Sequence, residues 1–229
     1  MDKSWRPTIV DLGLSVVIAL GFSFLAQALY NISGAIIPMI IYYGLAWGIA
    51  KWRRGYTGYF RKIEKKNLFY FYVNTGVIVI GLVLAYFARI EVEYANNLGI
   101  VLTALIWVPL NASSEQILWI YLFESWDLYD KEDEQNSKKN KLFRITGLIL
   151  FTVFVGTIHT LFWVKFLHTV DSTIIVGGIF VVITSVSGYL HIVVWRKTEH
   201  MIFTFIPHFL LNLFPLFWTG YSILPYLWK

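Results

Sequence analysis

Four polar side chains lie inside long apolar runs, where a polar group is costly: Glu115, His159, His208 and Asn212. His208 and Asn212 are four residues apart, so both project from one face of a helix. A carboxylate in an apolar surrounding is a stronger base than in water and can take a proton from a water molecule that attacks a carbonyl group. Imidazole and amide groups can stabilise the resulting oxyanion with hydrogen bonds. These residue types therefore indicate hydrolytic chemistry.

The same residues fit two other roles, and their spacing does not separate these from hydrolysis. Two histidines and one glutamate can bind zinc, and the ligands of such a site can come from distant segments. Polar side chains on neighbouring membrane helices also hydrogen-bond to one another and hold a bundle together. A catalytic site, a zinc site and a set of interhelical hydrogen bonds all stay open at this point.

The elements that carry these residues are membrane helices. The chain of 229 residues is 57% hydrophobic and 18% aromatic but only 14% charged, which excludes an ordinary soluble domain. A helix needs ~20 apolar residues to cross a hydrocarbon core of ~30 Å, and apolar runs of that length follow one another along this chain. The strands of a membrane β-barrel would instead show ~10-residue segments in which apolar and polar residues alternate. We predict an all-α, multi-pass transmembrane bundle of about seven helices that forms one domain, 1–229. The expected spans are 8–30, 33–52, 68–89, 98–125, 145–165, 174–195 and 201–218.

Three of these spans deliver the polar side chains to one layer of the membrane. With a rise of ~1.5 Å per residue, the four groups lie about 10 to 21 Å from the cytoplasmic ends of their helices. We therefore expect Glu115, His159, His208 and Asn212 around one polar cavity that opens toward the cytoplasm.

The charge pattern predicts the orientation and the surroundings of the chain. The formal net charge is +5, and the basic residues concentrate in the loops that are cytoplasmic when the N-terminus is inside. Seven crossings then place the C-terminus outside. Basic residues beside apolar spans favour anionic lipid headgroups as partners, and we find no nucleic-acid-binding motif. The chain contains no cysteine, which excludes disulfides, thiolate metal ligands and cysteine nucleophiles.

Three further ionisable residues are given structural interpretations. Asp11 and Glu124 lie near cytoplasmic helix ends and are expected to reach water. His191 lies just over one turn before the basic pair Arg196 and Lys197, and we expect it at the membrane interface.

Three segments within 112–214 resemble the motifs of a known family, in the same order and with similar spacing. The run from Ser114 to Phe123 resembles the first motif, EExxxR, of the CPBP superfamily, which contains the CAAX proteases and the bacteriocin-processing (Abi) enzymes. Val155-Gly156-Thr157-Ile158-His159 resembles the second, FxxxH, with Val in the Phe position. The block from Ser187 to Asn212 resembles the third, which ends in HxxxN. The first three spans are similar only as generic membrane helices.

The resemblance implies an intramembrane endopeptidase of a prokaryotic cell membrane, without an obligatory metal or other cofactor. By this likeness Glu115 activates water, His159 assists, and His208 and Asn212 form the oxyanion site. The substrate is then a peptide or a membrane-associated protein, of which a prenylated CAAX protein is one case.

Two positions depart from the family pattern. Gln116 stands where the second glutamate is usual, and Ile120 where the arginine is usual. The two changes together leave no unpaired charge in the bilayer, so they look coordinated. They leave open an alternative function, a catalytically inactive relative that binds a membrane partner as an adaptor or immunity-type protein. A small transporter is a third functional hypothesis.

Overall fold

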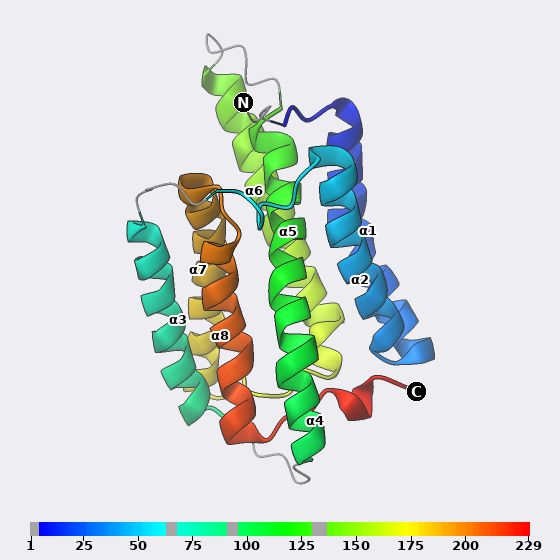
Figure 1. Ribbon diagram of the computed structural model, residues 1–229, viewed down its shortest axis with the longest axis vertical. Helices are drawn as coiled ribbons and strands as arrows, with labels where there is room; N and C mark the ends of the chain where they lie inside the picture. The colour runs from blue at the N-terminus through cyan, green and yellow to red at the C-terminus, as the bar shows by residue number, and fades with distance from the viewer. Residues whose placement is uncertain (1–4, 63–67, 91–95, 130–136) are drawn as a thin grey trace. The chain divides into compact units, whose positions relative to one another are not determined.

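The computed structural model describes residues 5–62, 68–90, 96–129 and 137–229, and helices are the regular elements of these ranges (Figure 1). Six helical segments there are long and apolar enough to cross a membrane. This finding confirms the all-α fold and identifies an integral membrane protein. The elements are α1 (Ile9–Ser33), α2 (Ile36–Ile49), η1 (Ala50–Arg54), α3 (Phe69–Phe87), α4 (Asn97–Leu102), η2 (Thr103–Trp107), α5 (Val108–Asp127), α6 (Ser137–Leu161), η3 (Trp163–Lys165), α7 (Ile175–Thr198), α8 (Ile202–Thr219) and η4 (Leu224–Tyr226).

Six of the seven expected spans correspond to these six membrane-length segments. The remaining span, 33–52, corresponds to α2, an apolar helix of 14 residues that continues without a break into the π-helical turn η1. The largest difference in boundaries is at α6, which begins at Ser137, eight residues before the expected span, because its polar first turns add to the apolar stretch.

The chain divides into two compact units, and the division falls within α5. The first unit contains residues 1–57, 117–165 and 229, and the second contains 58–116 and 166–228. The assignment of 1–229 to a single domain stays a prediction. Each unit is described by itself below.

The first unit is built around α1, which packs against α2 and α6. The rings of Phe22 and Tyr42 stack at 5.4 Å, and Phe154 of α6 lies against both. A hydrogen bond of 2.9 Å between the hydroxyl groups of Ser23 and Thr157 also joins α1 to α6. Aromatic packing with one polar contact therefore holds these helices together.

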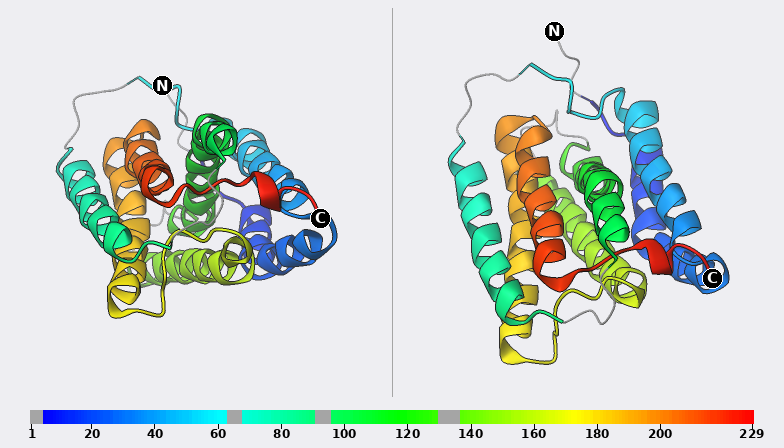
Figure 2. Two further views of the ribbon diagram at one scale, coloured as in Figure 1. Left: turned by 90° about the horizontal axis from the view of Figure 1, so that it is seen from below. Right: turned by 60° about the horizontal axis from the view of Figure 1, so that its bottom comes forward.

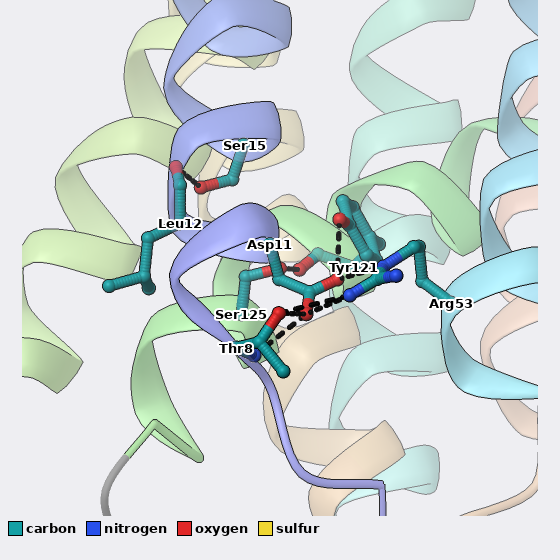
Figure 3. Close-up of polar contacts among 7 residues, drawn as sticks. All are labelled: Thr8, Asp11, Leu12, Ser15, Arg53, Tyr121 and Ser125. Atoms are coloured by element: carbon teal, nitrogen blue, oxygen red, sulfur yellow. Dashed lines mark hydrogen bonds and ion pairs between the residues drawn. The ribbon is translucent and has the colours of Figure 1, made fainter.

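One end of the first unit carries a cluster of polar contacts around the Asp11–Arg53 ion pair (Figure 3). The Asp11 carboxylate accepts two hydrogen bonds from the Arg53 guanidinium, at 2.8 and 3.0 Å, and one of 3.0 Å from the Tyr121 hydroxyl. It also accepts from the backbone N–H and hydroxyl of Thr8, which precedes α1. The donors to this carboxylate among the described residues thus come from η1, from α5 and from the residue before α1.

The expectation that Asp11 and Glu124 reach water was wrong, because both carboxylates are buried. Arg53 pairs with Asp11, and Arg54 pairs with Glu124 at 3.0 Å. Adjacent arginines at the end of one helix replace the water that each carboxylate would otherwise need.

The second unit contains α3, α7 and α8, which lie side by side (Figures 1 and 2), together with α4, η2 and the first turns of α5. The π-helical turn η2 ends at Trp107, two residues before Pro109. Proline has no backbone N–H, so the regular ladder cannot continue through it, and the N–H of Val108 bonds five residues back to Thr103 instead. This irregular turn sets the start of α5, the helix that carries Glu115.

The loop before α3 packs tightly against the C-terminal part of the second unit at Gly58. Its φ of +93° lies in the region that favours glycine, and a Cβ there would lie 2.6 Å from an indole carbon of Trp195. The Gly58 carbonyl accepts a hydrogen bond from the N–H of Met201. Glycine is therefore needed at this contact, beside the start of α8.

Candidate functional site

The centre of the site is a hydrogen-bonded pair between α5 and α8 in the second unit. Nε2 of His208 lies 2.9 Å from Oε2 of Glu115. Both side chains are almost completely buried, with 2% of Glu115 and 6% of His208 exposed. Glu115 and His208, predicted from the sequence to share one site, are therefore in direct contact.

The two oxygens of the Glu115 carboxylate have different surroundings. Oε2 accepts from His208 and, at 3.0 Å, from Nδ2 of Asn111, one turn earlier on α5. Oε1 is buried and makes no hydrogen bond within the described residues. Two donors thus fix the orientation of the carboxylate, and its second oxygen keeps its capacity to accept a proton.

The remaining donor predicted for the oxyanion site, Asn212, follows His208 by one turn of α8. Its Nδ2 is buried and has no hydrogen-bond partner in the part of the chain that the structure describes. Burial of an amide N–H without a partner costs free energy, and a ligand carbonyl or oxyanion would relieve that cost.

Neither residue at the two departures from the family motif is charged, and both are buried. Gln116 donates from Nε2 to the carbonyl of Thr204 on α8 at 2.9 Å, which leaves its buried Oε1 without a partner among the described residues. Ile120 is an apolar part of the core. The first motif therefore supplies one carboxylate and one interhelical amide contact.

His159 lies on α6, in the first unit. Its ring is exposed, and Nδ1 donates to the carbonyl of Val155 at 2.7 Å. Its participation in the Glu115 site stays a prediction.

The zinc alternative requires at least three ligands in one place. Among the described residues, no group of three histidine, aspartate or glutamate side chains is arranged to hold a metal ion. Glu115 and His208 contact each other directly, and the Asn111 amide donates to the same carboxylate. His159 belongs to the other unit, so a zinc site that includes it stays a prediction.

The structure adds three residues that were not predicted as part of the site: Asn74, Ser187 and His191. The His191 ring packs edge-to-face against that of His208, with 5.7 Å between ring centroids. His191 is 2% exposed, so the expectation that it lies at the membrane interface was wrong. The nearby basic pair Arg196 and Lys197 had indicated a position at the membrane interface, but the His191 ring points inward toward α3 and α8.

The sequence does contain one sign of this cluster, since Asn74 is a polar residue within the apolar span 68–89.

This arrangement is suited to acid–base chemistry in a site shielded from lipid. A carboxylate with one free oxygen can accept a proton, an adjacent imidazole N–H holds its other oxygen, and an amide donor lies one helical turn away. Comparison with family models, with curated proteins and with solved structures finds no match. The likeness to CPBP motifs therefore remains a hypothesis, and the functional argument rests on the geometry.

Proposed function

We propose that the protein is an intramembrane endopeptidase in which Glu115 activates water. The observation that carries the proposal is the 2.9 Å hydrogen bond between His208 Nε2 and Glu115 Oε2, made by two buried side chains. Oε1 of Glu115 has no hydrogen-bond partner among the described residues. A carboxylate held in this way is oriented for proton transfer before substrate arrives, which is what general-base catalysis requires.

The reaction follows from the roles of these atoms. Oε1 of Glu115 takes a proton from water as the water oxygen bonds to the peptide carbonyl carbon, and the carbonyl oxygen becomes an oxyanion. The Asn212 amide N–H donates to this oxyanion. Glu115 then returns the proton to the leaving nitrogen as the carbon–nitrogen bond breaks, which releases a carboxylic acid and an amine. His208 keeps its N–H on Oε2 and holds the carboxylate in place throughout.

A noncatalytic membrane protein is the second candidate, and one contact favours it. Gln116 binds the Thr204 carbonyl and so joins α5 to α8, as a purely structural motif would do. In this alternative, Glu115 and His208 also act only as an interhelical contact, and the protein binds a membrane partner without cleaving it.

The test is cleavage of a library of fluorogenic and membrane-anchored peptides by purified protein in detergent and in liposomes. Wild-type protein is expected to cleave at least one member, and Glu115→Gln to lose activity while remaining folded, because the amide keeps the shape without the base. Glu199→Gln, a change at a carboxylate with a 57% exposed side chain, is the matched control and keeps full activity.

The double variant Gln116→Glu with Ile120→Arg separates the candidates. Activity in the wild type that depends on Glu115 supports the endopeptidase. Activity that arises only in the double variant supports a silent relative and overturns the proposal for the natural chain.

A further inference from the structure

We propose that His191, held by Asn74 and Ser187, is the positioning residue that keeps the His208 imidazole aligned with Glu115. This inference rests on the proposed function, since it names a supporting residue of that same site. The three residues come from α3 and α7, outside the segments that carry Glu115 and His208.

The first step concerns the orientation of the Asn74 amide. The Ser187 hydroxyl donates to Asn74 Oδ1 at 2.7 Å, so the amide NH₂ group points the other way. Asn74 Nδ2 then lies 3.4 Å from each ring nitrogen of His191. Ser187 and His191 are one turn apart on α7, so a single helix face presents both to Asn74.

The second step concerns the His191 ring. Nδ1 lies 2.6 Å from the carbonyl of Ser187, and because a carbonyl can only accept, Nδ1 carries the proton. Asn74 of α3 and Ser187 of α7 therefore contact the His191 ring and fix its plane.

The third step connects this fixed ring to the dyad. His208 packs edge-to-face on His191, with an angle of 79° between the ring planes. Rotation of His208 away from Glu115 would break this packing as well as the hydrogen bond to Oε2. Displacement of a catalytic group by about 1 Å can lower a rate ~100-fold, so the support of the ring has kinetic consequences.

The test uses Ser187→Ala, which removes the hydroxyl that anchors Asn74 and leaves only a small space. Ser187→Thr keeps the hydroxyl and serves as the rescue. Ser185→Ala is the matched control, because Ser185 is an exposed serine of the same helix whose hydroxyl donates within α7. A fourth variant, His191→Phe, keeps a ring against His208 without its polar anchors.

The first readout does not depend on activity. Protein labelled with ¹⁵N-histidine in micelles reports the tautomer of His191 and the hydrogen bond of His208 Nε2, with each signal assigned by single substitutions. Ser187→Ala and His191→Phe are expected to move the His208 Nε2 signal toward its position in Glu115→Gln. Ser187→Thr and Ser185→Ala are expected to leave it in place.

The second readout is cleavage of a substrate found in the library test. Ser187→Ala and His191→Phe are expected to lower kcat roughly 10- to 100-fold with KM changed less than about two-fold, as expected for misalignment of a reacting group. A His208 signal that is unchanged in both variants overturns the inference, as does a changed signal with an unchanged kcat. If wild-type protein cleaves nothing, the proposed function fails, and the NMR comparison alone decides whether His191 positions His208.

Discussion

Replacement of Arg53 by methionine tests how the first unit tolerates a buried carboxylate. The change removes both guanidinium hydrogen bonds from Asp11, whose side chain is 0% exposed, while that of Arg53 is 21% exposed. Loss of one partner of a fully buried pair costs ~3–5 kcal/mol. Three other donors, the two groups of Thr8 and the Tyr121 hydroxyl, still donate to the carboxylate, and the Arg53 side chain is only partly buried. We therefore expect a loss of about 2–3 kcal/mol.

The measurement is a double-mutant cycle with Asp11→Asn. Unfolding in mixed dodecyl maltoside and SDS micelles, followed by circular dichroism, gives the free energy of unfolding of each variant. Since asparagine carries no charge, the cost of Arg53→Met should fall below ~1 kcal/mol in the Asp11→Asn background. The matched control, Lys197→Met at an exposed cation of α7, should cost less than ~0.5 kcal/mol. Equal costs of Arg53→Met in both backgrounds would refute the reasoning, because the loss would then come from arginine packing alone.

Three further measurements test other parts of the structure. Gly58→Ala should lower the free energy of unfolding by about 1–3 kcal/mol in the same assay, because the new Cβ would lie 2.6 Å from the Trp195 ring and the residue has a positive φ. Gly76→Ala is the control and should not destabilise the protein, because a Cβ there meets no atom within 4 Å. The hydroxyl and backbone N–H of Thr173 hold the pKa of the half-buried Asp171 carboxyl below its ordinary value. This group therefore stabilises the fold above its unfolded-state pKa and loses that contribution as the pH falls through the folded-state pKa. An NMR titration should therefore show a higher Asp171 pKa in Thr173→Val. An unchanged pKa would contradict the attribution of the shift to the Thr173 hydroxyl. The chain has no cysteine, so Phe60→Cys places a single thiol at a position where the side chain is 86% exposed. This thiol should react with an impermeant maleimide only from the cytoplasmic side, and reaction from outside would contradict the predicted orientation.

The helices could be predicted because the bilayer imposes a length on each apolar run. The expected span 68–89 became α3, Phe69–Phe87, and 201–218 became α8, Ile202–Thr219. The length of α2 was less predictable, because its apolar run ends in a π-helical turn with two arginines. An arginine at a helix end can face water or a carboxylate, and the local sequence does not decide between them. Arg53 faces a carboxylate because Asp11, 42 residues away in the sequence, lies beside it.

The site was predicted in part, for a similar reason. Glu115 and His208 were expected at one site because both are costly in lipid and lie in the same layer, and the structure places them 2.9 Å apart. Nothing local indicated that His191 turns inward, since a histidine near the end of a span can equally face water. Its inward position depends on Asn74, which is 117 residues away in the sequence.

The Asp11–Arg53 pair has a consequence for the order in which the chain enters the membrane. Before η1 has been synthesised, the Asp11 carboxylate lacks the two hydrogen bonds that the Arg53 guanidinium donates to it, and its residence in lipid is correspondingly costly. Arg53 follows 42 residues later, at the end of η1, and the two charges then form a neutral pair. The first two helices are therefore expected to insert into the bilayer together, as a helical hairpin. The Tyr121 hydroxyl, which follows Asp11 by 110 residues, closes the cluster only when α5 arrives.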